Sequence, residues 1–501
     1  MEFLSSKIAD VQQSPLFYPL LTVSFVLLIH HVVYNVYFHP LAHIPGPIIA
    51  RISPLWLWYH SYIGDEATVI DNLHEIYGPI LLVSPYEVDI SDPAAINPIY
   101  IAKGGFPKAP CYANFDIDGH KTIFSTTDPE YRSPRAKAVV GLFSTKAIKE
   151  NEDKLYGCVD RMVSRLESEK KKGKVDILNL CRSLAVDAVS THLFAQNYNG
   201  VSESGGTLSA SAFVDTFVAV GRFFYLPNLL FLWLEWGTEK VLGDVNTATS
   251  FEVVEKFVEG LVDRAVPSKN GNYPGRLLEV GLSKDEVKVQ CKDLIFAGTD
   301  STGMNMATMC RQLVLNPEKY FLPTLLFLYR VNEFRYKRLY TELQTNNSLP
   351  ESSIQEIQSL TYLSAVIRET LRISMANPTR LPHIVPSSGF NLQNTHIPAG
   401  TVVGCSGYSL HFNPKVFPEP HAFKPERWLE NVTSEMNTSF FAWGAGNRAC
   451  IARNLATTEL YMAAERLILS RVLEGAKSEG EVEIFEWFNS CVKGEGIELV
   501  W

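Results

Sequence analysis

The residues best suited to chemistry gather near the C-terminal end, in the stretch WGAGNRACIARNLA, residues 443–456. Gly444 and Gly446 permit a tight turn and a close approach to a flat partner. Arg448 is a permanent cation that pairs with a carboxylate. Cys450 precedes a helical run, whose free N–H groups and dipole stabilise a thiolate. Haem with an axial cysteine is the simplest flat, carboxylate-bearing group that binds a thiolate. The alternative is a glycine-rich loop with an incidental buried cysteine.

A second pattern, AGTDST at residues 297–302, lies inside the helical run 287–315. Glycine followed by an acid and hydroxyls is unfavourable in a helix. The pattern is explained if the helix passes close to a cofactor and opens locally there, so that an acid and an alcohol can relay protons. The candidate catalytic residues are Asp300, Ser301 and Thr302.

Two ionic patterns lie between that helix and the cysteine loop. Glu369 and Arg372 share one helical face, which by itself is a common surface pair. Arg427, in FKPERW, adds a second arginine. In this order, the four patterns together resemble those of the cytochrome P450 family of haem-thiolate monooxygenases. The resemblance covers the whole chain, and YSLHFNP…FPEPHAFKPERW is most similar to the fungal, membrane-anchored members.

The resemblance implies a mainly α fold with small β-sheets, and it gives roles to residues of this chain. Cys450 would be the proximal ligand of the iron of haem b, and Asp300 and Ser301 would deliver protons to dioxygen. A buried ionic cluster would brace the cysteine loop, and removing one partner of such a cluster is strongly destabilising. That cluster would consist of Glu369, Arg372 and Arg427.

The resemblance also implies the walls of the haem and substrate sites. The residues that would contact the haem are Arg135, His383, Trp443, Gly444, Gly446, Arg448 and Cys450. The residues that would line the distal substrate pocket are Phe124, Leu294, Phe296, Ala297, Asn377 and Thr379, with parts of residues 111–124 as a lid. Such a mostly apolar pocket suits a lipophilic substrate that arrives from the membrane.

Four positions depart from the family's usual residue. Trp443 stands where phenylalanine is usual, and Ala452 stands where a glycine follows the cysteine. Ser301 replaces threonine, which keeps the hydroxyl and loses the stiffening methyl group. His383 stands where an arginine often faces a haem propionate. A neutral histidine would hydrogen-bond there and titrate near neutral pH.

Arg135, in EYRSPRAKA, is the candidate contact of the other propionate, with Arg132 as the alternative. Together with Lys137 and Arg453, these arginines would also form a basic patch that docks an acidic redox partner. A solvated helix face is an equally good interpretation of the patch.

Composition limits the remaining function classes. The chain has 501 residues, is 46% hydrophobic and 20% charged, and can bury a large core. Its length alone suggests two or three domains, but no repeat or linker divides residues 51–501, which predict one mostly helical catalytic domain. The net charge of −9 disfavours a nucleic-acid partner. The 8 cysteines include no CxxC pair, so neither a zinc site nor a disulfide framework is indicated.

The N-terminal region predicts a membrane anchor. After a tail at residues 1–15, residues 16–38 contain no Asp, Glu, Lys or Arg and are long enough to cross a bilayer. A cleaved signal peptide is the alternative, but no small-residue cleavage site follows. Residues 39–50 form a proline-rich hinge. This order predicts a single-pass protein of the endoplasmic reticulum, with its catalytic domain in the cytosol.

Two apolar segments within the catalytic domain each have two interpretations. Residues 213–236 are rich in Phe, Leu and Trp, and predict either core or a second element that dips into the membrane. Residues 321–337, FLPTLLFLYRVNEFRYK, separate two helical runs that would otherwise join. They predict an atypical surface loop, which is either a family-specific insertion or intron sequence read through in a gene model.

The function predicted from these patterns is a monooxygenase of fungal secondary metabolism, acting on a lipophilic small molecule. Electrons would come from an NADPH-dependent flavin reductase. Within enzymes, the alternative is that the same haem site performs desaturation, ring expansion or isomerisation. Outside enzymes, the alternative is a silent haem-binding membrane protein, damaged by residues 321–337 and by Ala452.

Overall fold

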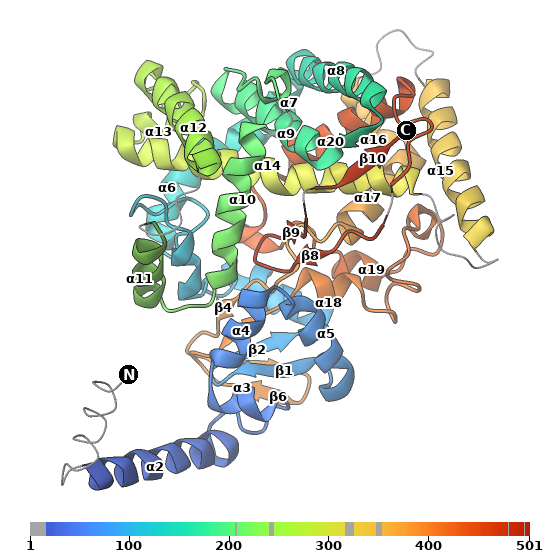
Figure 1. The fold of residues 1–501 in the computed structure, drawn as a ribbon. Helices are drawn as coiled ribbons and strands as arrows, with labels where there is room; N and C mark the ends of the chain where they lie inside the picture. The colour runs from blue at the N-terminus through green and yellow to red at the C-terminus, as the bar shows by residue number, and fades with distance from the viewer. Residues whose placement is uncertain are drawn as a thin grey trace, which may run out of the picture.

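The computed structural model describes residues 17–205, 208–239, 245–315, 325–346, 353–478, 480–494 and 496–501. The predicted tail, residues 1–15, lies outside the described residues. A large body of helices adjoins a smaller region that carries the main sheet, and the N-terminal helix extends away from both (Figure 1). The mainly α fold with small β-sheets is therefore confirmed.

The described chain contains the following regular elements. The α-helices are α2 (Phe17–Val33), α3 (Ile48–Ile52), α4 (Leu55–Ile63), α5 (Glu66–Tyr77), α6 (Pro129–Val139), α7 (Thr145–Lys149), α8 (Glu152–Glu169), α9 (Ile177–Phe194), α10 (Ser209–Val220), α11 (Asn228–Glu239), α12 (Val245–Arg264), α13 (Tyr273–Glu279), α14 (Lys284–Val314), α15 (Leu325–Asn346), α16 (Ile354–Ser359), α17 (Thr361–Ile373), α18 (Gly407–His411), α19 (Ser434–Ser439) and α20 (Arg453–Leu469). The strands are β1 (Ile80–Ser84), β2 (Glu87–Ile90), β3 (Lys174–Asp176), β4 (His383–Ile384), β5 (Phe390–Leu392), β6 (Thr395–Ile397), β7 (Val402–Gly404), β8 (Ile484–Phe485), β9 (Cys491–Val492) and β10 (Glu498–Val500).

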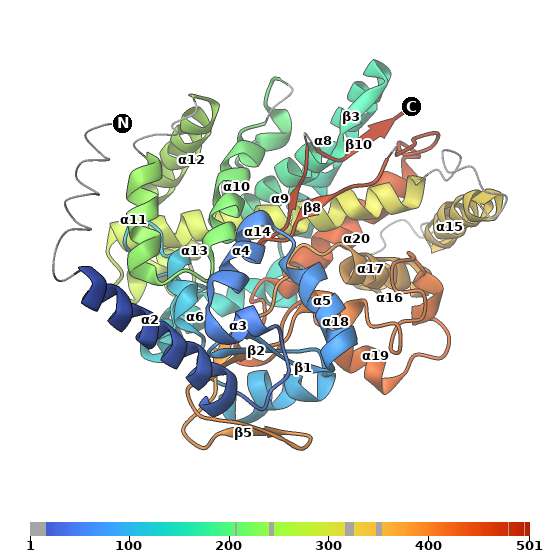
Figure 2. The ribbon, with the colours of Figure 1, turned by 60° about the horizontal axis from the view of Figure 1, so that its bottom comes forward.

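The N-terminal helix has the properties of a membrane anchor. Residues 18–38 form a helical span of 21 residues that is long and apolar enough to cross a bilayer. Its side chains are exposed, and α2 projects from the body in both views (Figures 1 and 2). The polar residues at its far end are paired: Asn35 donates to the carbonyl of His31 at 2.9 Å, and His31 contacts the carbonyl of Ile52 in α3 at 2.8 Å. The His31 contact ties the end of this helical span to α3.

The main sheet has the strand order β1-β2-β7-β4 and receives the hinge at its first strand. The predicted strand pair within residues 80–90 is an antiparallel hairpin. The amide of Leu82 in β1 donates to the carbonyl of Pro45 at 2.8 Å, and a Cβ on Gly46 would overlap the carbonyl oxygen of Leu82. The hinge therefore turns at a glycine because the strand leaves no room for a side chain.

Helix α14 crosses the centre of the helical body and packs against α9 (Figure 1). It begins at a capping box formed by Ser283 and Glu286. The helix is unbroken over 31 residues, so the expected local opening is wrong. Gly298 is instead explained by packing, because a Cβ at this position would lie only 2.7 Å from Cγ2 of Val189 in α9. The missing side chain lets the two helices approach closely.

The apolar segment 213–236 divides into a buried and an exposed half. Phe213 in α10 is buried in the core. Leu229 and Trp233 in α11 are 76% and 71% exposed, and α11 lies on the same side of the body as α2 (Figure 2). Core packing explains the apolar residues of α10, whereas α11 leaves an apolar surface exposed.

The described part of the segment 321–337 is helical, which corrects the expected loop. Residues 316–324 lie outside the described residues. From Leu325, the chain continues as α15 through residues 338–344 without a break. Arg335 is buried and pairs with Glu426, with 3.1 Å between Nη2 and Oε2. Both interpretations of its origin, an insertion and a read-through intron, stay predictions, but Arg335 in its second half contacts the body.

Candidate functional site

An interior cavity of about 300 Å³ lies between α14 and the cysteine loop, here residues 441–452. Parts of the expected lid, residues 111–124, form one wall. All of the predicted substrate-pocket residues line this cavity: Phe124, Leu294, Phe296, Ala297, Asn377 and Thr379. Ring contacts among Phe115, Phe124 and Phe488 make the lid side aromatic.

The cysteine loop is shaped by two glycines with left-handed backbone. Gly444 has a φ of 64° and lines the cavity. Gly446 has a φ of 69°, but it does not line the cavity, which corrects the expectation of a cofactor contact. A Cβ on Gly446 would overlap the carbonyl oxygen of Tyr100, so this glycine serves packing within the chain. The amide of Cys450 donates to the carbonyl of Trp443 at 2.9 Å and closes the loop.

Cys450 lines the cavity, and it is the one cysteine of the eight with a large accessible surface, although protein atoms surround it on most sides. Helix α20 begins three residues later, at Arg453. Burial raises the pKa of the Cys450 thiol, while the N–H groups of Ala452 and Arg453 and the charge of Arg453 lower it. The helix start thus favours the thiolate, as expected, but burial outweighs it. A further positive charge, such as a metal ion, is needed for a stable thiolate.

Cations converge on the same cavity without a matching number of acids. Arg132, Arg448 and Lys108 line it, and Asp293 is the one carboxylate among the described lining residues. Burial and then the charge of Arg132 lower the pKa of Arg448 to about 10. Burial and then the charges of Arg448 and Arg132 lower the pKa of Lys108 well below its usual range. Carboxylates entering the cavity would relieve this repulsion.

For the expected propionate contact, the structure favours Arg132, the alternative candidate, over Arg135. Arg135 does not line the cavity. It pairs with Glu286 at 3.1 Å, and its guanidinium lies 3.6 Å from the centroid of the Tyr131 ring. An acid in the first turn of α14 therefore holds it away. The basic patch is corrected as well, because Arg132 faces the interior while Lys137 and Arg453 remain exposed.

His383 lines the cavity in a form that cannot replace an arginine. Burial, together with the charges of Lys108 and Arg448, lowers its pKa to about 4 against the opposing effect of the hydrogen bond to Leu381, so the expected titration near neutral pH is wrong. Its Nδ1 contacts the carbonyl of Leu381 at 3.1 Å. Nδ1 must carry the proton to donate there, and Nε2 is then an acceptor. Lys108 pairs with His383 along the backbone, and its side-chain nitrogen lies 2.7 Å from the carbonyl oxygen of Phe124 at the same cavity. Sequence reasoning missed this lysine, whose one signal is its place in the apolar stretch FPKAPCY.

The catalytic candidates on α14 separate into two groups. Ser301 and Thr302 line the cavity. Asp300 does not: its carboxylate accepts from Arg182 at 2.8 Å and from the side-chain amide of Asn489 at 2.9 Å. Burial raises the pKa of Asp300, and the charge of Arg182 lowers it. The acid thus reaches the cavity only through Asn489, which lines it.

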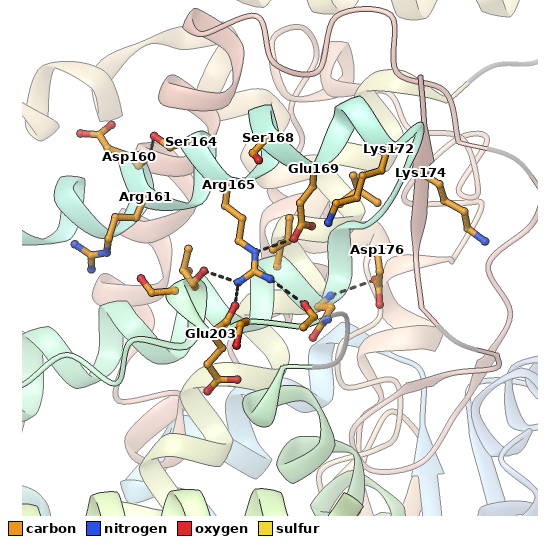
Figure 3. Close-up of a pocket in the computed structure, with 17 residues that line it drawn as sticks. Asp160, Arg161, Ser164, Arg165, Ser168, Glu169, Lys172, Lys174, Asp176 and Glu203 are labelled. Atoms are coloured by element: carbon orange, nitrogen blue, oxygen red, sulfur yellow. Dashed lines mark hydrogen bonds and ion pairs between the residues drawn. The ribbon is translucent and has the colours of Figure 1, made fainter.

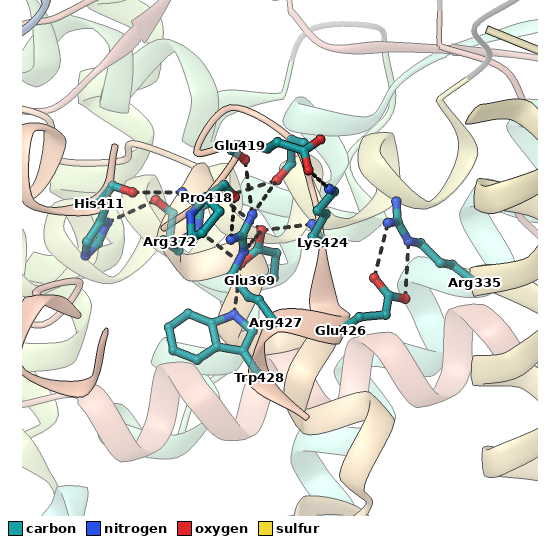
Figure 4. Close-up of polar contacts among 11 residues, drawn as sticks. Arg335, Glu369, Arg372, His411, Pro418, Glu419, Lys424, Glu426, Arg427 and Trp428 are labelled. Carbon is teal, nitrogen blue, oxygen red and sulfur yellow. Dashed lines mark hydrogen bonds and ion pairs between the residues drawn. The ribbon is translucent and has the colours of Figure 1, made fainter. Parts of the chain in front are cut away.

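The structure brings the predicted ionic cluster together around one buried carboxylate (Figure 4). Glu369 and Arg372 are fully buried, and Arg372 donates to both carboxylate oxygens, at 3.0 and 2.8 Å. Nε of Arg427 donates to the same carboxylate at 3.1 Å. The amide of Lys424 and the indole N–H of Trp428 complete its shell, each at 2.9 Å.

His411 joins this cluster to the cysteine loop and was missed by sequence reasoning. Its Nδ1–H donates to the carbonyl of Arg372 at 2.9 Å, and its Nε2 accepts from the amide of Phe441 at 2.8 Å. Burial and then the charge of Arg372 lower its pKa to about 3, so it stays neutral in both roles. A histidine in YSLHFNP gives no sign of such a bridge, because its two partners lie in distant parts of the sequence.

A second hollow lies on the surface beside α8 and has a different character (Figure 3). Arg165 occupies its centre and donates to Glu169 at 2.9 Å and to the carbonyls of Val201 and Glu203 at 2.6 and 2.7 Å. Its central cation is therefore fully engaged within the chain, and the catalytic candidates lie elsewhere.

The residues of the interior cavity fit a haem. Among the described residues, no group of three His, Cys, Asp or Glu side chains could hold a metal ion. A metal at Cys450 would then bring most of its ligands with it, as a macrocycle does. The unbalanced cations suit the carboxylates of such a group, and the apolar walls suit its ring.

Comparisons with known proteins agree with this geometry. The family model described as Cytochrome P450 matches residues 45–320 and 322–493. The chain is 35% identical to cytochrome P450 monooxygenase mfmF of Annulohypoxylon moriforme, over 95% of this chain and 98% of that relative. It is 30% identical to cytochrome P450 monooxygenase tazI of Aspergillus terreus over 86% of each chain. It is 26% identical to a pisatin demethylase of Fusarium vanettenii, over 92% of this chain and 88% of the relative. The chain therefore belongs to the cytochrome P450 family of monooxygenases, whose members hold haem iron through a cysteine thiolate.

Proposed function

We propose that this protein is a haem-thiolate monooxygenase that inserts one oxygen atom into a lipophilic small molecule of fungal secondary metabolism, with Cys450 as the iron ligand. One observation carries the proposal: Cys450, an excess of cations and an apolar wall face the same interior cavity. When bound, haem supplies the reductive activation of dioxygen. The fungal relatives named as monooxygenases support the assignment to this chemistry.

The chain's own residues then have separable tasks. Arg132, Arg448 and Lys108 hold the carboxylates of the cofactor by charge. Ser301 lies on the cavity face of α14, and its Oγ is 3.4 Å from the carbonyl of Ala297. This long hydrogen bond is weak, so the hydroxyl can turn toward the cavity and hand on a proton. The aromatic lid side excludes bulk water from the reaction.

The bridge from the ionic cluster holds the cysteine in place. Because His411 fixes the amide of Phe441, the position of the cysteine loop depends on a cluster that is itself fully buried. The loop therefore keeps one geometry without contacts from the substrate. Such an arrangement suits an enzyme that holds the iron ligand rigidly, independent of the substrate.

We further propose that electrons come from an NADPH-dependent flavin reductase and that α2 anchors the protein in the endoplasmic reticulum membrane. Lys137 and Arg453 are exposed and would attract an acidic partner. With the catalytic domain in the cytosol, the N-glycosylation sequons at Asn346, Asn431 and Asn437 would remain unmodified. A mass shift on glycosidase treatment would show the opposite topology.

The decisive experiment expresses the full chain in microsomes with a flavin reductase. Reduced parent protein should give the thiolate-type carbon monoxide spectrum, and Cys450→Ala should abolish it. Cys158→Ala is the matched control, because Cys158 is buried in α8 and does not line the cavity. An unchanged spectrum in Cys450→Ala would overturn the proposal. Mass spectrometry of products from candidate metabolites then separates oxygen insertion from desaturation, ring expansion and isomerisation.

A further inference from the structure

Asp293 is the one carboxylate among the described residues that line the interior cavity, and the proposed chemistry gives it no task. It lies on α14, four residues before Ala297 and eight before Ser301. Residues spaced by four lie on one helical face. Asp293 therefore belongs to the same cavity-facing stripe as the hydroxyl that serves the reaction.

The Asp293 carboxylate keeps acceptor capacity that the chain does not use. Within the described part of the chain, no cation lies within 4 Å of it, and it accepts a hydrogen bond from the Thr122 hydroxyl. A carboxylate has about four lone-pair sites. Asp300, the next acid along the helix, differs because Arg182 and Asn489 hold both of its oxygens.

The surroundings make a spare carboxylate costly. Burial raises the pKa of Asp293 to about 7, although the Thr122 hydrogen bond and the charge of Lys108 lower it. The nearby walls are aromatic, with Phe124 in contact with Phe115 and Phe488. A buried acid without enough donors is unfavourable, so a donor group brought by a ligand would be bound strongly at this place.

The chemistry of that donor follows from its neighbours. The ammonium of Lys108 already bonds the carbonyl of Phe124 at 2.7 Å and acts on Asp293 through its charge. A cationic amine beside Asp293 would be repelled by Lys108, the cation whose charge acts on that carboxylate. A hydroxyl carries no charge and donates one hydrogen bond, so it meets the need without this repulsion.

We propose that Asp293 anchors the hydroxyl group of a lipophilic alcohol or phenol and turns the far end of that molecule toward Ser301. This inference rests on the proposed function. Eight residues of α-helix span about 12 Å along the axis. The hydroxyl and the carbon that is oxidised should therefore be separated by about that distance, and shorter alcohols cannot reach both positions.

The test uses straight-chain primary alcohols and the alkanes of the same length, with the full-length ferric holoenzyme. The change in the Soret absorbance on ligand binding gives a Kd for each probe. The measured quantity is the alkane Kd divided by the alcohol Kd, compared between parent, Asp293→Leu and Asp293→Asn. Asp285→Asn is the matched control, since Asp285 lies on the same helix and its side chain is 79% exposed.

Asp293→Leu should lower this ratio by about tenfold or more for the long probes, as expected for loss of a hydrogen bond to a charged group. Asp293→Asn keeps a carbonyl acceptor and should lower the ratio less, and Asp285→Asn should leave it unchanged. The advantage of the alcohol should appear only when the chain is long enough to span the cavity.

An equal ratio in parent and Asp293→Leu would overturn the anchor, and so would an advantage that does not depend on chain length. If Asp293→Leu fails to bind haem, Asp293→Asn serves as the test. A ratio of alkane Kd to alcohol Kd in Asp293→Asn equal to that of the parent then overturns the proposal. Failure of the proposed function is distinguishable, since the parent protein itself would then lack the thiolate-type carbon monoxide spectrum.

Discussion

Replacing Glu369 by glutamine should separate the haem site from the rest of the fold. The carboxylate accepts five hydrogen bonds, from Arg372 twice and from Arg427, Lys424 and Trp428 once each. Glutamine has nearly the same shape, but it removes the charge and offers two donors to partners that are donors themselves. Arg372 is fully buried and would remain as an uncompensated cation.

The cost of that change can be estimated from the burial of the pair. Breaking a fully buried ion pair by removing one partner costs about 3–5 kcal/mol. A whole domain is stabilised by only about 5–15 kcal/mol, so the loss is a large part of the total. If Arg372 shifts, its carbonyl no longer holds the ring of His411. His411 then no longer accepts the hydrogen bond from the amide of Phe441. We therefore expect the cysteine loop to lose its geometry before the distant helices melt.

The assay measures haem content, the thiolate-type carbon monoxide spectrum and thermal unfolding of the same preparation. Glu369→Gln should lose haem and the spectrum, with a clearly lower unfolding temperature. Glu419→Gln is the matched control, because the side chain of Glu419 is 68% exposed and pairs with Lys424 at the surface, where solvent screens the pair. Equal haem content and equal stability in the two variants would refute the reasoning.

Four further predictions concern proton delivery, the iron, pH and the apolar segment. Ser301→Ala should raise peroxide relative to product while substrate affinity holds, measured as product per electron; an equal yield would remove this hydroxyl from the mechanism. If the Trp443 indole N–H reaches the sulfur, Trp443→Phe should lower the haem potential, and an unchanged potential in redox titration would mean that the ring only packs. Burial raises the pKa of Glu66 from 4.5 to about 8, so its contribution to stability is complete below pH 4.5 and falls as the pH rises toward 8. Glu66→Gln should therefore flatten the fall in unfolding temperature between pH 5 and pH 7.5. An equal fall in parent and variant would contradict this. Sequencing the messenger RNA across residues 321–337 decides whether the segment exists. If it does, loss of haem when the segment is deleted would show that it is a structural part of α15, including the buried Arg335.

The sequence was sufficient where a function depends on local spacing. Cys450 is followed at once by the helix that receives it, and Glu369 and Arg372 share a face because they are three residues apart in one helix. The N-terminal helix is equally local, since its length and composition alone make it long and apolar enough to cross a bilayer. The cavity-lining residues Leu294 and Phe296 on α14 came from the family resemblance and not from spacing, because two residues apart in a helix they lie on different faces.

Tertiary structure alone decided which side chains share a cavity and in which protonation state. Arg132 rather than Arg135 faces the interior because Glu286, far away in sequence, captures the latter. His383 is kept neutral by burial, a property that no spacing encodes. The bridge at His411 and the position of Asp293 in the cavity wall exist only because distant segments pack together. Local patterns specify residue types and faces, whereas pairing and desolvation depend on the partners that the fold brings within a few ångströms.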